Sequence, residues 1–285
     1  MKLLSEIRQQ YDQAAFLIGN GPNLYSQIMP SWTDLLREAG DKNVAFALVG
    51  LSYTEVYDLL ELTTKDHWAI KPRIVKLLKT ITSDDLSLHK RLMELAKQTN
   101  SPVLTTNFDP AFEESIEAPL RHISPKGFTR FYPWKSYYSP EILNQPTSGF
   151  GIWKVHGDLR YKDSIRLGLT DYMGSVERAR KMIAKGRYRL LKKNLKRWNG
   201  SNTWLDIWFK MPIIIVGFGF GAHETFLRWL LIERKKFFRN ELKQEAFHIH
   251  YITVGEPPAD VKNLLETLGV TFHFADSFEE IYATL

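Results

Sequence analysis

Two short polar motifs, each soon after an apolar run, hold residue types that could carry out chemistry. Asn107 and Asp109 come after the apolar residues 102–104, and His156 comes after residues 151–153. In an open α/β sheet, ligands bind in the crevice outside the carboxyl ends of the strands. An amide, a carboxylate and an imidazole brought to that edge by two strands could act together on a nucleotide. We therefore expect Asn107, Asp109 and His156 to share one site.

Each of these three residues also has an ordinary structural explanation. Asn107 could satisfy its amide in a loop or helix cap, and Asp109, directly before Pro110, could cap a helix. His156, directly before Gly157, could be a hydrogen-bonded histidine at a strand end. All three explanations would have to hold together, in this order and beside two glycine turns, so a shared site is the better interpretation.

Glycine-rich turns follow two other apolar runs. Gly19-Asn20-Gly21 comes after residues 14–18, and Gly217-Phe218-Gly219 comes after residues 212–216. Backbone N–H groups at the start of a helix can bind a phosphate, and glycines let the backbone approach it closely. The first turn has two glycines rather than the three of the dinucleotide fingerprint. Taken alone, each turn is equally compatible with tight packing of a helix on a strand and no ligand.

The composition is that of an ordinary soluble domain. The chain has 285 residues, of which 44% are hydrophobic and 25% charged. This length suits one α/β domain with a helical insert. Its longest apolar runs are too short to span a bilayer, and residues 1–10 lack the apolar core of a signal peptide. We predict a cytoplasmic protein without a membrane segment.

Metal chemistry finds little support in the sequence. The chain has no cysteine, which excludes disulfides, a thiol nucleophile and a zinc site built on thiolates. His248 and His250 lie two residues apart in a predicted strand, a spacing seen in metal sites. No acidic partner marks them, so we interpret them as histidines of an edge strand and predict no metal.

The positive charge is concentrated in one predicted helical segment, residues 174–198. This segment has ten Lys or Arg residues and one Glu, so its net charge is +9. The net charge of the whole chain is +6, so the remaining residues together carry −3. We interpret it as a solvated helix face or a contact with an acidic subunit surface. Nucleic-acid binding through residues 178–197 is a less favoured alternative.

Apolar runs alternate with helical patterns along the chain. This alternation predicts an α/β fold with a Rossmann-like, doubly wound parallel sheet. Residues 54–98 have helical spacing with a break near Pro72, and we predict a helical insert there. Residues 123–149 combine loop composition with many aromatics, which indicates an ordered lid or wall. We treat residues 1–285 as a single domain.

The order of these motifs resembles the sirtuin (Sir2) fold, and more closely the Sir2-like domains of bacterial anti-phage defence systems. Residues 28–36, Ile-Met-Pro-Ser-Trp-Thr-Asp-Leu-Leu, are similar to the Pro-Ser/Thr-Trp-x-x-Leu run of that branch. The deacylases have Pro-Asp-Phe-Arg in its place. Residues 227–231, Leu-Arg-Trp-Leu-Leu, also resemble the defence branch. The resemblance extends over nearly the whole chain and implies a sirtuin-like sheet.

The same resemblance implies NAD as the substrate and assigns roles to the motif residues. Asn107 would position the catalytic water or the ribose, and His156 would act as general base on a ribose hydroxyl or water. Asp109 would bind the nicotinamide amide. Gly19, Gly21 and Asn23 would cradle the pyrophosphate, with Gly217 and Gly219 near the adenosine half. The complete set of implied NAD contacts is Gly19, Asn20, Gly21, Asn23, Thr106, Asp109, Gly217 and Gly219.

Two departures from the sirtuins narrow the expected reaction. Thr106 stands where sirtuins have a Gln that contacts the ribose, and the four zinc-binding cysteines of the deacylases are missing. Because the zinc module helps to build the acyl-peptide cleft, deacylation is disfavoured. Nicotinamide leaves as a neutral molecule, so the enzyme mainly stabilises an oxocarbenium-like ribose and supplies a nucleophile. We expect hydrolysis of NAD to nicotinamide and ADP-ribose, with a neutral imidazole as base.

The resemblance further implies control by assembly. An unrestrained NAD hydrolase would kill its host, so we expect an effector subunit of an anti-phage system that forms homo-oligomers. We also expect a separate partner protein, for which a ring-forming ATPase or translocase is a candidate. Two other hypotheses stay open: a nucleotide- or nucleic-acid-binding module without chemistry and, less favoured, an NAD-dependent protein deacylase.

Overall fold

The fold is built around a single mixed sheet. The computed structural model describes residues 2–40, 50–64, 66, 70–80, 85–123, 133–184, 198–242 and 247–283. Eight strands pair in the order β3-β4-β5-β2-β1-β6-β7-β8. Their bounds are β1 Ala15–Ile18, β2 Val103–Thr105, β3 Leu120–His122, β4 Ser136–Tyr138, β5 Ile152–Lys154, β6 Ile213–Val216, β7 Ile249–Val254 and β8 Thr271–Ala275.

Most of the sheet is parallel, as the sequence predicts. Six neighbouring strands run parallel, in the order β5-β2-β1-β6-β7-β8. At one edge of the sheet, β4 pairs antiparallel with both β5 and β3. β1 lies between β2 and β6, so the strand order reverses between β1 and β6. This reversal is a topological switch point, where ligands bind in doubly wound sheets. Both glycine turns leave the sheet at this point.

Alternate side chains of the central strands enter two separate cores. Ala15 and Leu17 of β1 pack in the first core, and Phe16 and Ile18 pack in the second. β6 divides in the same way, with Ile213 and Ile215 in the first core and Ile214 and Val216 in the second. Successive side chains of a strand point to opposite faces, so an unbroken apolar run is what a sheet covered on both faces requires.

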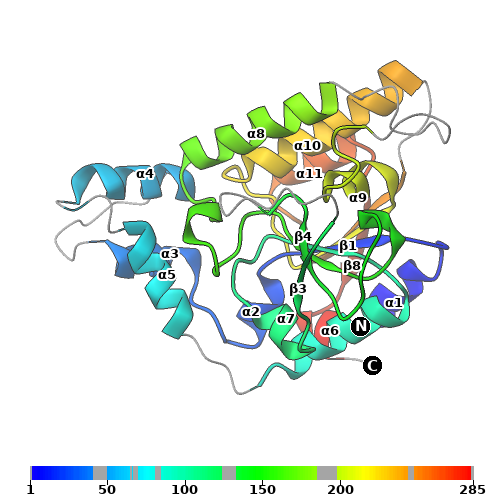
Figure 1. The fold of residues 1–285 in the computed structure, drawn as a ribbon, viewed down its shortest axis with the longest axis horizontal. Helices are drawn as coiled ribbons and strands as arrows, with labels where there is room; N and C mark the ends of the chain where they lie inside the picture. The colour runs from blue at the N-terminus through cyan, green and yellow to red at the C-terminus, as the bar shows by residue number, and fades with distance from the viewer. Residues whose placement is uncertain are drawn as a thin grey trace.

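Helices cover both faces of this sheet (Figure 1). The first core includes side chains of α8, α9, α10 and α11, and the second includes side chains of α1, α6, α7 and α12. The helix bounds are α1 Lys2–Arg8, α2 Gly21–Tyr25, α3 Trp32–Ala39, α4 Tyr53–Thr63, α5 Ile70–Thr80, α6 Ser87–Gln98, α7 Ala111–Ser115, α8 Leu169–Ala184, α9 Leu205–Lys210, α10 Thr225–Lys236, α11 Ala259–Thr267 and α12 Phe278–Tyr282.

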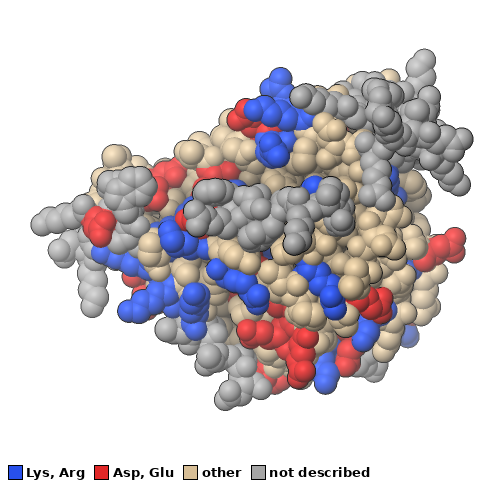
Figure 2. All heavy atoms as spheres, viewed as in Figure 1, with Lys and Arg blue, Asp and Glu red and all other residues tan. Residues whose placement is uncertain are grey.

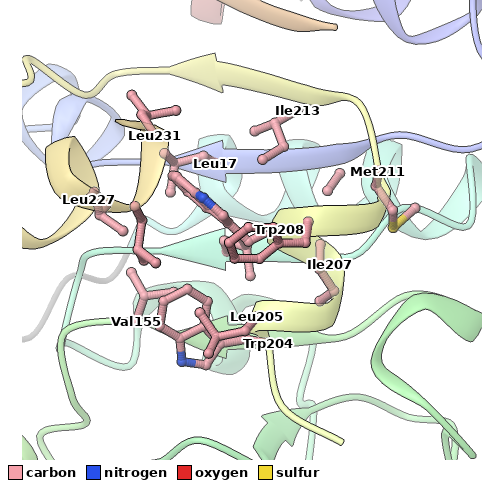
Figure 3. Packing of buried hydrophobic residues seen from close by; sticks show 14 of the residues in the cluster. Leu17, Val155, Trp204, Leu205, Ile207, Trp208, Met211, Ile213, Leu227 and Leu231 are labelled. Carbon is pink, nitrogen blue, oxygen red and sulfur yellow. The ribbon is translucent and has the colours of Figure 1, made fainter. Parts of the chain in front are cut away.

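Tryptophans of α9 fill much of the first core (Figure 3). Trp204 and Trp208 have no exposed surface, and Figure 3 shows them among Leu17 of β1, Val155 and Leu227 of α10. Large aromatic side chains remove much apolar surface from water, so this helix joins the sheet to α10.

A third apolar cluster joins α3, α4 and α5 beside the sheet. It contains Leu36 of α3, Leu60 of α4 and Ile74 of α5, and it also holds Phe108 from the first polar motif. Of the helices within residues 54–98, where one insert was expected, α4 and α5 belong to this cluster. α6 instead packs on the sheet in the second core.

Serine caps fix where two helices of this third cluster begin. The Ser31 hydroxyl accepts from the backbone N–H of Asp34, and Ser52 and Glu55 form a complete capping box. Such caps satisfy N–H groups that have no partner in the first helical turn. They place Trp32 at the start of α3 and Tyr53 at the start of α4.

Part of the aromatic segment 123–149 is built into the sheet, because Ser136–Tyr138 form β4. Tyr137 and Tyr138 of β4 are buried, and Tyr137 stacks on Trp153 at a ring distance of 5.0 Å. These aromatic side chains pack inward from β4, which pairs antiparallel with β3 at the edge of the sheet. Residues 124–132 lie outside the described residues, so a lid there stays a prediction.

The basic segment falls partly within α8. Residues 174–184 form the larger, C-terminal part of this helix, whereas residues 185–197 lie outside the described residues. On the face shown in Figure 2, Lys and Arg side chains lie among Asp and Glu side chains. None of the described helices is both long and apolar enough to cross a lipid bilayer.

The two histidines near residue 250 do not belong to an edge strand, contrary to the expectation from sequence. β7 pairs with β6 on one side and β8 on the other, so His250 is interior. Its Nε2 lies 2.5 Å from the Tyr11 hydroxyl and its Nδ1 lies 2.9 Å from Nε2 of His273. Burial lowers the pKa of His250 to about 4, with His273 and His248 acting in the same direction.

Candidate active site

A cavity of about 480 Å³ lies at the switch point. Its wall includes residues that follow β1, β2, β5 and β6, together with side chains of α3, α4 and α12. Most of the residues predicted from the sequence meet here, namely Asn20, Gly21, Thr106, Asn107, Asp109, His156, Gly217 and Gly219. Gly19 and Asn23 are not part of the wall.

The two glycine turns pack against each other. The backbone N–H of Gly21 donates to the carbonyl oxygen of Gly217 at 2.9 Å. A Cβ on Gly19 would collide with that same carbonyl group, and a Cβ on Gly217 would lie 2.6 Å from the Tyr282 hydroxyl. Gly217 also has φ +63°, a conformation that glycine adopts at no steric cost. Packing therefore explains the glycines at these positions. This agrees with the interpretation of the turns as tight packing of a helix on a strand.

Gly219 differs from the other glycines of the turns. A Cβ added there would meet no atom within 4 Å. Packing does not require glycine at this position. Because Gly219 also lines the cavity, the open space beside it faces the cavity.

Asn107 has a side chain whose amide nitrogen is not used by the fold. The residue is buried, and Nδ2 has no hydrogen-bond partner among the described residues. Its backbone N–H donates to the Thr105 hydroxyl at 3.1 Å, which fixes the turn after β2. An unpaired buried donor is costly, so a ligand that accepts from this amide would remove the cost. Because of this unpaired donor, the site fits a ligand that is rich in acceptor oxygens, such as NAD.

Asp109 is held by hydrogen bonds on both carboxylate oxygens. Oδ1 accepts from the backbone N–H of Ala111 at 3.1 Å, and Oδ2 accepts from Nδ2 of Asn23 at 2.9 Å. Asn23 was expected at the pyrophosphate, but its side chain is fully buried beneath the cavity wall. In the structure, Asn23 contacts Asp109 rather than the cavity.

A buried ion pair supports the turn that carries Asn107 and Asp109. The ammonium of Lys154 lies 2.8 Å from Oε1 of Glu113 and donates to the carbonyl oxygens of Phe108 and Asp109. Burial raises the pKa of Glu113 to about 7, against the effect of Lys154. Lys154 thus links the end of β5 to the turn after β2.

His156 forms a buried pair with Glu224. Nε2 lies 2.6 Å from Oε2 of Glu224, and Nδ1 lies 3.1 Å from the carbonyl oxygen of Val155. A carbonyl oxygen can only accept, so Nδ1 carries a proton. At 2.6 Å, a second proton lies between Nε2 and the carboxylate, because two acceptors would repel each other. The pair can therefore hold or release one proton at Nε2.

Glu224 has a second partner, which fixes its position. It is the N-cap of α10, and Oε1 accepts from the backbone N–H of Leu227 at 3.2 Å. Glu224 was not predicted from the sequence as a site residue. The sequence signal was an acidic residue five positions after Gly219, at a helix start, and sequence spacing gives no distance between this residue and His156.

Aromatic and basic side chains complete the wall around this pair. Tyr172 packs edge-on against His156 at a ring distance of 5.3 Å, and Tyr53 packs edge-on against His223 at 4.8 Å. Burial lowers the pKa of His223, whereas the Glu224 carboxylate acts in the opposite direction. Arg166 also lines the cavity, and its backbone N–H donates to the carbonyl oxygen of His156 at 2.9 Å. Neither Arg166 nor His223 was identified as a site residue from the sequence.

Metal ligands are not grouped in the part of the chain that the structure describes. No three His, Asp or Glu side chains there are placed to hold one ion.

Comparison with known proteins identifies the family. The sequence profile of the SIR2-like domain matches residues 101–273, which include both polar motifs and the second glycine turn. No curated protein matches the chain. Because the profile covers more than half of the chain, the protein belongs to the SIR2-like domain family.

Proposed function

We propose that the protein hydrolyses NAD to nicotinamide and ADP-ribose. The observation that carries this proposal is one cavity at the switch point that brings together Asn107, Asp109 and the His156–Glu224 pair. Membership of the SIR2-like family supports NAD as the ligand. NAD is the substrate here, and the chain's own residues supply the binding and the proton transfer.

The cavity offers suitable groups for both ends of this substrate. Asp109 holds two fixed carboxylate oxygens that can accept from the amide of nicotinamide. The open side of Gly219 gives the diphosphate room beside the second glycine turn. Arg166 adds a cationic side chain to the same wall, and cationic groups favour phosphate.

The reaction breaks the bond between the ribose C1′ and the nicotinamide nitrogen. The electron pair of that bond goes to the pyridinium nitrogen, so nicotinamide leaves as a neutral molecule. Water forms the new C–O bond at C1′ and gives up one proton. The unpaired Nδ2 of Asn107 can donate to the ribose or, through its Oδ1, the side chain can orient the water.

In this scheme the His156–Glu224 pair accepts the proton of the water after it has released the proton that lies between Nε2 and the carboxylate. Glu224 holds the imidazole in one orientation through the contact at Nε2. The Val155 carbonyl keeps the other ring nitrogen protonated, so only Nε2 can take part.

The test is nicotinamide release from NAD by the wild-type chain beside Asn107→Ala. We expect the variant to lose about 100-fold or more of the rate, because it lacks the donor aimed at the reacting sugar. Its melting temperature should stay close to that of the wild type, since Nδ2 makes no hydrogen bond in the fold. Asn263→Ala, an exposed asparagine on α11, is the matched control and should keep full activity. Equal rates for Asn107→Ala and the wild type would contradict the site assignment.

We further propose that the chain acts as an effector of an anti-phage system, assembles with copies of itself and is controlled by a partner protein, for which a ring-forming ATPase or translocase is a candidate. Exposed apolar side chains on α4 and α8, namely Leu62, Leu169 and Met173, support an assembly surface there. Light scattering during gel filtration should give a mass above that of one chain, and substituting Leu62 and Met173 by Ser should reduce it. A monomer at all concentrations, alone and with its partner, would refute this proposal.

A further inference from the structure

A buried histidine outside both polar motifs is hydrogen-bonded toward the site. His89 lies in α6 and has no exposed surface, and its Nε2 lies 2.8 Å from Oδ1 of Asn23. Its Nδ1 has no partner among the described residues. A proton on Nδ1 would leave a buried donor without an acceptor, so the ring carries its proton on Nε2. Burial lowers the pKa of His89, against Asp109 and Asp85, and this keeps the ring neutral.

The donor on His89 fixes which way the Asn23 amide points. Nδ2 of Asn23 donates to Oδ1 of Asn20 at 2.9 Å and to Oδ2 of Asp109 at 2.9 Å. If the amide were turned over, its oxygen would face the Asp109 carboxylate and its NH₂ group would face the His89 donor. Both contacts would be repulsive, so the network allows a single orientation.

The three side chains form a chain of hydrogen bonds with one direction. Nε2–H of His89 donates to Asn23, and Asn23 donates to Asp109. The other oxygen of Asp109 is held by the backbone N–H of Ala111. The carboxylate that lines the cavity is thereby fixed from two sides.

We propose that His89 is a positioning residue that fixes the Asp109 carboxylate, through the Asn23 amide, for recognition of a ligand's carboxamide. The ligand named here rests on the proposed function, whereas the positioning does not. A fixed carboxylate accepts from the NH₂ group of nicotinamide and repels the carboxylate of nicotinate. His89 thus contributes to specificity without contact with the ligand.

The kinetic test compares two substitutions of His89. His89→Leu removes the donor, and we expect kcat/KM for NAD to fall about 10-fold or more. His89→Gln can still donate to Asn23 and should recover most of this loss. In an Asp109→Ala background, His89→Leu should cause little further loss, because both changes act through the same carboxylate. Leu92→Ala, a buried change in the same helix, is the control for simple loosening of α6.

Three kinetic results would overturn the proposal. These are equal activity of His89→Leu and the wild type, a loss in His89→Gln as large as in His89→Leu, and an undiminished loss in the Asp109→Ala background. An equal loss in Leu92→Ala, measured well below its melting temperature, would assign the effect to helix packing and would equally overturn it.

A spectroscopic test does not depend on any activity. In the ¹⁵N-histidine NMR spectrum at pH 7.5, the signal absent from His89→Gln should belong to a neutral ring protonated at Nε2. Its Nε2–H shift should change in Asn23→Ala. A ring protonated at Nδ1, or at both nitrogens, would refute the proposed chain of hydrogen bonds from His89 through Asn23 to Asp109. If the wild type releases no nicotinamide, either alone or with its partner protein, the proposed function fails and this measurement alone decides whether His89 positions Asp109.

Discussion

The polar residues of the second motif have different surroundings, although they are close in sequence. Lys154 reaches under the turn after β2, whereas His156 pairs with Glu224 at the cavity. Asp158 accepts from the Tyr138 hydroxyl and from the backbone N–H of Arg160, so it stabilises local structure. From residue type alone, each of the three could equally be assigned to the active site. Only the partners of each side chain distinguish the residue proposed for proton transfer from those that support the structure.

Replacing Glu224 tests proton transfer without disturbing the fold. Glu224→Gln keeps an oxygen for the backbone N–H of Leu227 and a group that can donate to Nε2 of His156. It removes the carboxylate, so Nε2 accepts from the new amide instead of sharing a proton with Glu224. We expect nicotinamide release to fall about 10²- to 10³-fold with little change in melting temperature. A release assay beside a thermal melt measures both, and a variant with wild-type turnover would exclude the pair as proton acceptor.

At the scale of elements, the sequence predicted the buried parallel strands well. β1 and β6 are short apolar runs bounded by glycine turns, and the same alternation of strand and helix placed both motifs at strand ends. It could not reveal that Asn23 turns inward, because the sequence does not show the buried His89 that fixes it. Nor could it separate α6 from α4 and α5, since all three helices have similar apolar spacing.

Two glycines of the second turn should respond differently to alanine. In Gly217→Ala, the new Cβ meets the Tyr282 hydroxyl at 2.6 Å in a left-handed backbone conformation. We expect the free energy of unfolding to fall by about 2–4 kcal/mol. Gly219→Ala meets no atom within 4 Å, so its stability should change by less than about 0.5 kcal/mol, while the KM for NAD rises. Denaturant melts of the two variants measure the difference, and equal losses of stability would contradict the packing argument.

At the scale of the whole molecule, one hydrogen-bonded chain joins the N-terminal helix to the far side of the sheet. The Tyr11 hydroxyl, just after α1, contacts His250 of β7, which contacts His273 of β8. The contact between the two rings is lost when both are protonated, because Nδ1 of His250 and Nε2 of His273 would then both be donors. Burial lowers the pKa of both histidines. Low pH should therefore weaken the contacts that join the segment after α1, β7 and β8.

The pH dependence of stability follows from these lowered values. The unfolded chain protonates its histidines near pH 6.5, whereas folded His250 does so only at about 4. Between these values the unfolded state binds more protons, so stability falls as the pH falls. We expect the melting temperature to drop by a few degrees from pH 7 to pH 5. His250→Gln, which keeps an acceptor for Tyr11 but does not titrate, should show a smaller drop, and an unchanged drop would exclude His250 as its source.

Glu224 serves at once as a helix cap and as the partner of His156, and this double use has a consequence for comparing related sequences. A relative could retain the asparagine motif, the histidine motif and both glycine turns, and still carry an uncharged capping residue such as Ser or Asn here. Such a residue would start α10 equally well, so the fold would be unaffected. We expect relatives of that kind to bind the nucleotide without cleaving it. This single capping position would then distinguish turnover from sensing across an alignment, where the better-known motifs would not.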